Sequence, residues 1–226
     1  LFSEGQIIGP REAPHLNGQL NAKKLAFHQQ KVNTLEAKVN TDLTPDGKFN
    51  IQLFAHQLLL EKYPFTDVSL LAQGITAQHT IDLNLKGADR LAIQFTGGLQ
   101  KQSWQGQITR ADLQSPQWHD WHLIAATPLK IDADAVNVNQ LCLRAQQQFV
   151  CTTGDVQLKP TPVLHLTGTA KIDLRYFYPL RTWLPQISHP FGEVSTSVRL
   201  TGKLQHPELS GSISLKNAGS SIPCLG

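Results

Sequence analysis

The sequence predicts an all-β protein, an elongated and curved antiparallel sheet with one apolar face. Apolar side chains recur at every second position in roughly a dozen runs, the period of a strand with one covered face. Short polar loops join these runs, which favours an antiparallel meander because parallel strands need long crossovers. Only one segment has helical spacing.

The alternation is clearest over residues 198–219, where one register carries Arg, Thr, Lys and Ser and the other is apolar. A similar stretch starts at Pro14: Pro, Leu, Gly, an aliphatic residue and Lys recur at the same offsets as from Pro207. The chain therefore repeats a one-sided strand. The apolar register of residues 198–219 contains Val198, Leu200, Leu204, Leu209, Ile213 and Leu215.

Turns and one short helix complete the expected order of elements. Thr-Pro-Asp-Gly at 44–47 and Lys-Gly-Ala-Asp-Arg at 86–90 are typical of tight reversals. Residues 176–184 predict the helix, since apolar side chains there follow i, i+3, i+4 spacing, with Pro179 in its first turn and Pro185 at its end. The helix either caps exposed apolar edges, the reading we favour, or plugs a groove.

A sheet of this size must bury its apolar face in a sandwich, in a barrel, or against a ligand in an open trough. A dozen strands at ~4.8 Å would be roughly 58 Å wide. Aromatic residues are only 7% of the chain, fewer than the core of a sandwich favours. Glycines fall within the apolar register, where they permit a lengthwise bend into a U with walls of about 16 Å, the length of one lipid tail. These glycines are Gly74, Gly168, Gly202 and Gly211.

We therefore expect one shared hydrophobic groove. Eight side chains in apolar registers are its predicted lining: Leu83, Leu85, Ile93, Phe95, Ile172, Val198, Leu200 and Ile213.

Two of the three cysteines lie in one predicted hairpin. If its turn is centred between Gln146 and Gln147, Cys142 faces Cys151 in a non-hydrogen-bonded pair, where a cross-strand disulfide fits. A disulfide would imply an oxidising compartment such as the periplasm. Two buried free thiols are the alternative, and Cys224 is left over as an ordinary apolar residue.

The sequence offers no pattern typical of a catalytic, metal or nucleic-acid site. Net charge is +3 and the basic residues are scattered, whereas nucleic acid needs a clustered basic face. His119 and His122 lack the further ligands of a zinc site, and Asp132 and Asp134 read as solvated strand positions. No nucleophile elbow or P-loop is present. We expect no enzymatic activity, no metal and no cofactor.

The chain reads as one piece of a longer protein. It starts at Leu1, contains no Met, and ends at Gly226 in an apparent strand. No apolar run approaches the ~18 residues of a membrane span. We expect residues 1–226 to form one segment of a longer repetitive β-groove protein, truncated at both ends.

Several degenerate motifs, in order along the chain, resemble the C-terminal half of proteins of the TamB family, within the AsmA-like superfamily. Two of them are the segment 174–185 and the strand Trp-x-Gly-x-Ile at 104–108, and the close pair Cys142 and Cys151 also matches. The resemblance is strongest after about residue 80. A third motif alternates Leu or Ile with Gly around a proline, at Leu200, Gly202, Leu204, Pro207, Leu209, Gly211, Ile213 and Leu215.

The resemblance implies a U-shaped β-sheet with a hydrophobic groove, also called a β-taco. Such proteins are anchored in the inner membrane of Gram-negative bacteria and reach through the periplasm to a TamA-like outer-membrane barrel, as part of the translocation and assembly module. The implied function is a conduit for phospholipid acyl chains. A scaffold for unfolded outer-membrane strands and autotransporters is the alternative, and a plain secreted β-sandwich is the third hypothesis.

Overall fold

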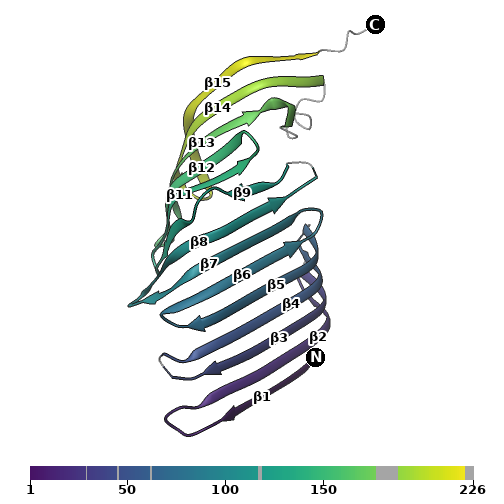
Figure 1. Ribbon diagram of the computed structural model, residues 1–226, viewed down its shortest axis with the longest axis vertical. Helices are drawn as coiled ribbons and strands as arrows, with labels where there is room; N and C mark the ends of the chain where they lie inside the picture. Colours follow the sequence, from purple (N-terminus) through teal and green to yellow (C-terminus); the bar gives the residue numbers. More distant parts are fainter. Residues whose placement is uncertain (29, 45, 62, 117–118, 177–187, 222–226) are drawn as a thin grey trace. The chain divides into compact units, whose positions relative to one another are not determined.

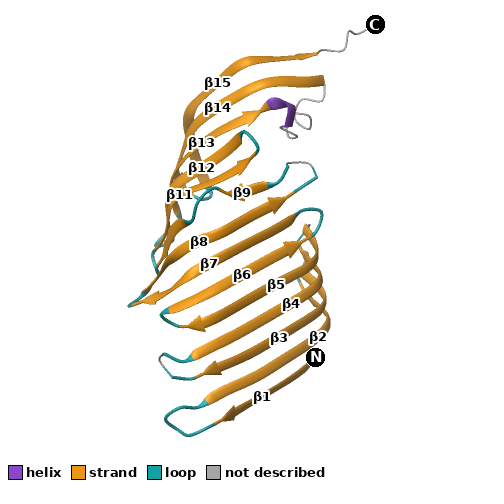
Figure 2. Ribbon diagram, in the orientation of Figure 1, coloured by secondary structure: helices purple, strands orange, loops and turns teal. Residues whose placement is uncertain are grey.

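The computed structural model describes the whole chain except residues 29, 45, 62, 117–118, 177–187 and 222–226 (Figure 1). The described residues form 15 strands and one short 3-10 turn (Figure 2). Every strand pair with a described register is antiparallel. The predicted all-β antiparallel class is confirmed. The chain divides into two units, residues 1–113 and 114–226.

Unit 1 is an open meander in which each strand pairs with its neighbours along the chain. The turn at residues 87–89 lies where the sequence predicts it, and the N–H of Gly87 donates to the carbonyl of Asp89 at 2.8 Å. The strands are β1 (Phe2–Ile8), β2 (His15–Phe27), β3 (Gln30–Asp42), β4 (Lys48–Leu60), β5 (Tyr63–Ile75), β6 (Gln78–Lys86), β7 (Arg90–Gln100) and β8 (Ser103–Gln114).

Unit 2 is also an antiparallel meander, with strand order β10-β11-β12-β13-β14-β15 and the short strand β9 paired with β11. A 3-10 turn, η1 (Leu174–Tyr176), follows β13. The rest of the predicted helix at 176–184 lies outside the described residues. The strands are β9 (Trp121–Leu123), β10 (Thr127–Ile131), β11 (Ala135–Ala145), β12 (Gln148–Gln157), β13 (Val163–Asp173), β14 (Ser188–Lys203) and β15 (His206–Ser221).

Burial in both units is that of a sheet with an accessible apolar face. Leu53, Leu70 and Leu83 occupy the centre of unit 1, yet each is only half-buried. The most deeply buried of the described residues are mostly small, such as Ala22, Ala55 and Ala145, and the largest side chain among them that is almost fully buried is that of Thr127. Since large side chains in a closed sandwich core lose nearly all their exposure, this pattern differs from that alternative.

Candidate functional site

Cross-strand pairing gathers the apolar register of unit 1 onto one side of the sheet, here called apolar face 1. Residues directly opposite each other in neighbouring strands point to the same side. Leu53 of β4 faces Ala37 on one side and Leu70 on the other, and Leu70 faces Leu83, which faces Ile93. The apolar side chains of unit 1 therefore form one continuous hydrophobic surface and are not isolated from one another.

Apolar face 1 consists of parallel rows that run across β3 to β7, two residues apart along each strand. Three rows contain no hydrogen-bonding side chain. The first is Val39, Ile51, Ala72, Ile81 and Phe95; the second is Ala37, Leu53, Leu70, Leu83 and Ile93; the third is Leu35, Ala55, Val68, Leu85 and Leu91.

Beyond the third row, four strands break their alternation at the same level. Lys24, Asn33, Gln57 and Thr66 lie side by side on β2 to β5, and none has a bridge partner although the pairs before and after keep register. All four side chains are exposed. We call this row the crease.

The crease shifts the side-chain alternation by one residue. In β4 the apolar positions are Leu53 and Ala55 before the crease but Leu58 after it, and Leu58 is again half-buried while Gln57 is exposed. The row beyond the crease is Leu25, Val32, Leu58 and Phe65. Apolar side chains therefore stay on the same side of the sheet beyond the bend. Without the one-residue shift, the apolar side chains beyond the crease would lie on the opposite side of the sheet.

Backbone geometry explains how the crease forms. Lys24 has φ +54° and Gln57 has φ +50°, the left-handed conformation that bends a strand where a bulge occurs. In Figure 1, the strands β2 to β5 bend at their right-hand edge. We did not predict the crease from the sequence, although the apolar positions Ala55 and then Leu58, and Ala22 and then Leu25, show the one-residue shift in alternation that marks it.

The opposite end of apolar face 1 carries a polar and aromatic row, here called the rim, which consists of Thr41, Phe49, Gly74, His79 and Gly97, with Trp104 of β8 against it. The indole N–H of Trp104 donates to Nε2 of His79 at 2.8 Å, and Nδ1 of His79 lies 3.2 Å from the carbonyl of Ile75. Because Nε2 accepts, Nδ1 carries the proton and donates to that carbonyl. The Phe49 ring lies 5.5 Å from the imidazole, centroid to centroid.

Trp104 is seated on two glycines. Cβ atoms at Gly97 and Gly106 would lie 2.8 Å from Cζ2 and 2.6 Å from Cη2 of the indole, closer than real Cβ atoms approach other atoms. The absence of side chains at these positions lets the ring approach the backbone closely. Within β3 to β7, the rim differs from the three apolar rows because it contains two hydrogen-bonding side chains, those of His79 and Thr41.

The other side of unit 1 is polar and carries ion pairs. The Nδ1–H of His56 donates to Asp67 at 2.8 Å, with Lys86 3.5 Å from the same carboxylate. The hydrogen bond from His56, then the nearby charge of Lys86, lowers the pKa of Asp67. His15 similarly lowers the pKa of Asp42 through a 2.8 Å hydrogen bond. Water can solvate this face, so apolar face 1 alone needs a covering.

Unit 2 repeats the one-sided pattern, and we call its apolar side apolar face 2. Leu166 faces Leu200, which faces Leu209, and two residues along, Gly168, Val198 and Gly211 form the next row. Ile172 pairs with Val194, and Ile213 pairs with Thr196 in the same register. In β15 the apolar face is open: Leu209, Ile213 and Leu215 are 71%, 73% and 63% exposed.

The eight predicted lining residues thus fall on two faces. Leu83, Leu85, Ile93 and Phe95 lie on apolar face 1, and Ile172, Val198, Leu200 and Ile213 lie on apolar face 2. Whether these faces line one shared groove stays a prediction. Three of the four predicted bend glycines, Gly74, Gly202 and Gly211, have φ +139°, +88° and +156°, conformations that side chains rarely allow.

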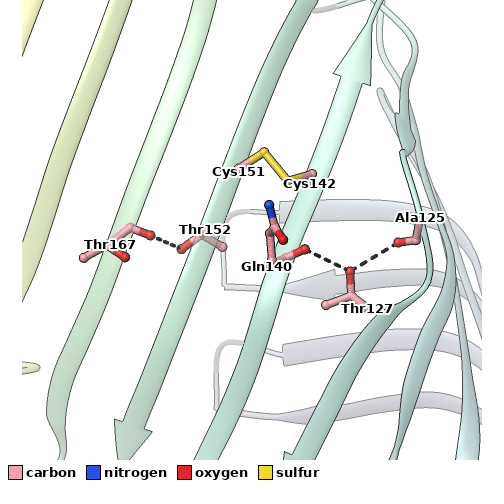
Figure 3. The surroundings of a disulfide bond; sticks show 7 residues. All are labelled: Ala125, Thr127, Gln140, Cys142, Cys151, Thr152 and Thr167. Carbon is pink, nitrogen blue, oxygen red and sulfur yellow. Dashed lines mark hydrogen bonds between the residues drawn. A yellow bond between two sulfur atoms is a disulfide. The ribbon is translucent and has the colours of Figure 1, made fainter.

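Cys142 and Cys151 form a disulfide between β11 and β12 (Figure 3). They are directly opposite, their Cα atoms are 4.1 Å apart, and Ala145 faces Gln148 at the turn. The register is the one expected from a turn centred between Gln146 and Gln147. The pairing alternation places the disulfide on the polar side, away from Val150 and Leu143 of apolar face 2.

The hairpin that carries the disulfide also contains a bulge. Asn139 and Gln140 of β11 together face Thr153, and Gln140 has φ +54°. Its carbonyl accepts from the hydroxyl of Thr127 at 3.3 Å (Figure 3). A hollow of about 540 Å³ beside the bulge is lined mainly by Thr, Ser, Asn and Gln residues, with Arg199 as its charged residue.

His119 and His122, the histidines considered as zinc ligands, are not part of a metal-binding cluster in the described residues. The His119 ring packs edge-on against Tyr176, with centroids 4.5 Å apart. Among the described residues, no group of three or more His, Cys, Asp or Glu side chains is placed to hold a metal ion. The described residues also contain no helix whose length and apolarity would let it cross a bilayer.

Taken together, the open antiparallel sheet with one apolar face per unit defines a repetitive β-sheet protein with extended apolar surfaces. The family model described as TamB, N-terminal domain, matches residues 2–166, and the chain belongs to the TamB family. No curated protein and no solved structure matches the chain.

Family membership confirms the resemblance but corrects its placement. The motifs suggested the C-terminal half of the family's proteins and a match strongest after residue 80, whereas the matching model is that of the N-terminal domain and begins at residue 2. The motif around Pro207 misled the placement because one-sided strands of this type recur, as the repeat at Pro14 shows.

Membership in this family gives the general functional class of the chain. It is a structural and transport module, anchored in the inner membrane of Gram-negative bacteria, that works in outer-membrane assembly or lipid transport with a TamA-like outer-membrane protein.

Proposed function

We propose that the chain is a non-enzymatic periplasmic conduit in which an apolar sheet face shields phospholipid acyl chains between the inner and outer membranes. One observation carries the proposal: apolar face 1 stays apolar across β3 to β7 and past the crease, because the alternation slips by one residue where the strands bend. A bend that only relieved strain would not need to keep the lining apolar.

Acyl chains suit this surface on energetic grounds. Monomeric proteins rarely expose apolar patches beyond a few hundred Å², so a face of this extent needs an occupant. Each buried CH₂ contributes about 0.8 kcal/mol without requiring a directional contact. A uniform aliphatic face can therefore hold a lipid tail and still let it slide, since no row in its centre offers a hydrogen bond.

Photo-crosslinking in cells tests the proposal. A photo-reactive residue at Ile93, on apolar face 1, should capture phospholipid, which mass spectrometry of the adduct identifies. The same residue at Ala92, its neighbour on the polar side, is the matched control and should capture none. Equal capture at both positions, or capture of protein alone at Ile93, would contradict the conduit.

A scaffold for outer-membrane β-barrel strands and autotransporters is the second candidate. The observation in its favour is the exposed strand β15, which ends the strand order of unit 2. An incoming strand could add to this edge by backbone pairing. Capture of unfolded barrel protein from Ser212 of β15, with none of it from Ile93, would favour this function.

A further inference from the structure

The rim of unit 1 has a polarity that the rest of apolar face 1 lacks. Between the rim and the crease lie three rows without a hydrogen-bonding side chain, and beyond the crease lies the row of Leu25, Val32, Leu58 and Phe65. His79 and Trp104, by contrast, join a polar group to a large apolar ring, and both are half-buried. Side chains of this kind are favoured where an apolar medium meets a wet one.

We infer that the rim is the subsite for the ester and glycerol region of a diacyl lipid, so that lipids lie on apolar face 1 with headgroup at the rim and tails toward the crease. The inference rests on the proposed conduit and adds the orientation of its cargo. The reverse orientation would bury the polar ester carbonyls against purely apolar rows, whereas His79 and Trp104 at the rim are side chains of the kind favoured where an apolar medium meets water.

Dimensions agree with this orientation. From Phe49 in the rim to Ala55 in the third row is six residues along β4, about 20 Å at ~3.3 Å per residue. A lipid tail needs about 15 Å, half of the ~30 Å hydrocarbon core of a bilayer. A tail whose ester lies at the rim therefore ends before the exposed polar side chains of the crease.

The rim is also held in place, as a subsite must be. The imidazole is fixed by two hydrogen bonds, one from Trp104 and one to the carbonyl of Ile75, and the indole is seated on Gly97 and Gly106. The indole N–H and the imidazole therefore stay at one level of the sheet.

Paramagnetic lipids measure the orientation directly. The chain is titrated with phosphatidylethanolamine whose nitroxide sits either near the ester end or near the methyl end of one acyl chain. We expect the ester-end label to erase the NMR signal of the Trp104 indole N–H, assigned with a Trp104→Phe variant, and to spare the methyl groups of Leu85. The methyl-end label should do the opposite.

The outcomes separate this inference from the proposed function. If both labels erase both signals equally, or the order is reversed, lipids bind without this orientation and the rim assignment is wrong while the conduit stands. If neither label affects apolar face 1, the conduit itself is wrong.

A substitution assigns the orientation to His79. His79→Leu removes the polar group and keeps an apolar side chain, so the methyl-end label should then also reach Trp104. His79→Gln, which can still accept from the indole, should preserve the selectivity. Unchanged selectivity in a folded His79→Leu variant, checked by circular dichroism, would overturn the role of this residue.

Discussion

Asn33 donates its side-chain amide to Oε1 of Gln57 at 2.9 Å, linking β3 to β4 within the crease. These two residues lie opposite each other but are not a bridge pair of the ladder, because each is the residue at which the alternation of its strand shifts. The slip is therefore shared by neighbouring strands and not a defect of one. Shared slips keep the cross-strand register intact, which explains how the apolar lining continues past a bend.

Glycine usually destabilises a strand, but we expect it not to do so at Lys24, because the backbone of this crease residue is left-handed. Lys24 has φ +54°, a conformation that costs a non-glycine residue about 1 kcal/mol. Lys24→Gly should leave the free energy of unfolding unchanged or raise it by up to ~1 kcal/mol. Urea titration followed by circular dichroism measures the change.

Lys38→Gly is the matched control for this substitution. Lys38 is also an exposed lysine, but it lies in the regular part of β3, where glycine should lower the stability by about 0.5–1 kcal/mol. Equal losses in both variants would show that the crease does not relieve strain at Lys24.

Charge on an apolar face should abolish transport without unfolding the protein. Ile93→Arg and Val198→Arg place an unpaired charge where a tail would lie, which costs several kcal/mol when the tail covers it. Without lipid the charge reaches water, so circular dichroism should show folded protein. In cells, outer-membrane integrity should fail as in a deletion strain.

Neighbouring positions on the polar side supply the controls. Ala92→Arg and Ser197→Arg add the same charge to the same strands but on the opposite face, and should retain function. Full activity of the folded Ile93→Arg and Val198→Arg variants would rule out the conduit and leave the scaffold as the better account.

Titration of Asp67 should depend on His56. The hydrogen bond from His56 is the main cause of the lowered pKa of Asp67, with Lys86 a smaller one. His56→Gln should raise this pKa toward its ordinary value, as followed by NMR of the carboxyl carbon, while His165→Gln should not. Because the folded pKa is below the unfolded one, the pair stabilises the fold above the unfolded pKa, and this stabilisation is lost as pH falls through the folded pKa.

The disulfide should contribute measurably to the stability of unit 2. Closing a loop of about ten residues is worth roughly 2.5–3 kcal/mol in the chain-entropy model. The double variant Cys142→Ser, Cys151→Ser should lose about this much, and peptide mapping without reductant should find the two cysteines joined. Recovery of both as free thiols from oxidised periplasmic material would contradict the pairing.

The strands were predictable because their signal is local. Alternation at Leu83, Leu85, Ile93 and Phe95 depends only on the residues of each run, and the turn at 87–89 only on its own Gly and Asp. The cysteine register followed from counting outward from one turn. Features that depend on several strands at once were not predicted. The crease is one of them, because it forms only where one-residue shifts in alternation coincide in four neighbouring strands.

The rim was missed for a related reason. His79 and Trp104 are 25 residues apart, and what unites them is the glycine pair on which the indole lies. Read singly, each is an ordinary half-buried side chain. The helix at 176–184 is a different case, because most of it falls outside the described residues.

The strand order of unit 1, in which β1 to β8 pair successively, also bears on how the chain folds. Each hairpin closes a short loop, so the entropy lost before the first contacts form is small and contact order is low. A newly exported chain can add each strand to the one that emerged before it, from the amino terminus onward, without waiting for a distant partner. Assembly can then keep pace with secretion, and little unpaired apolar surface is left exposed to aggregate at any moment.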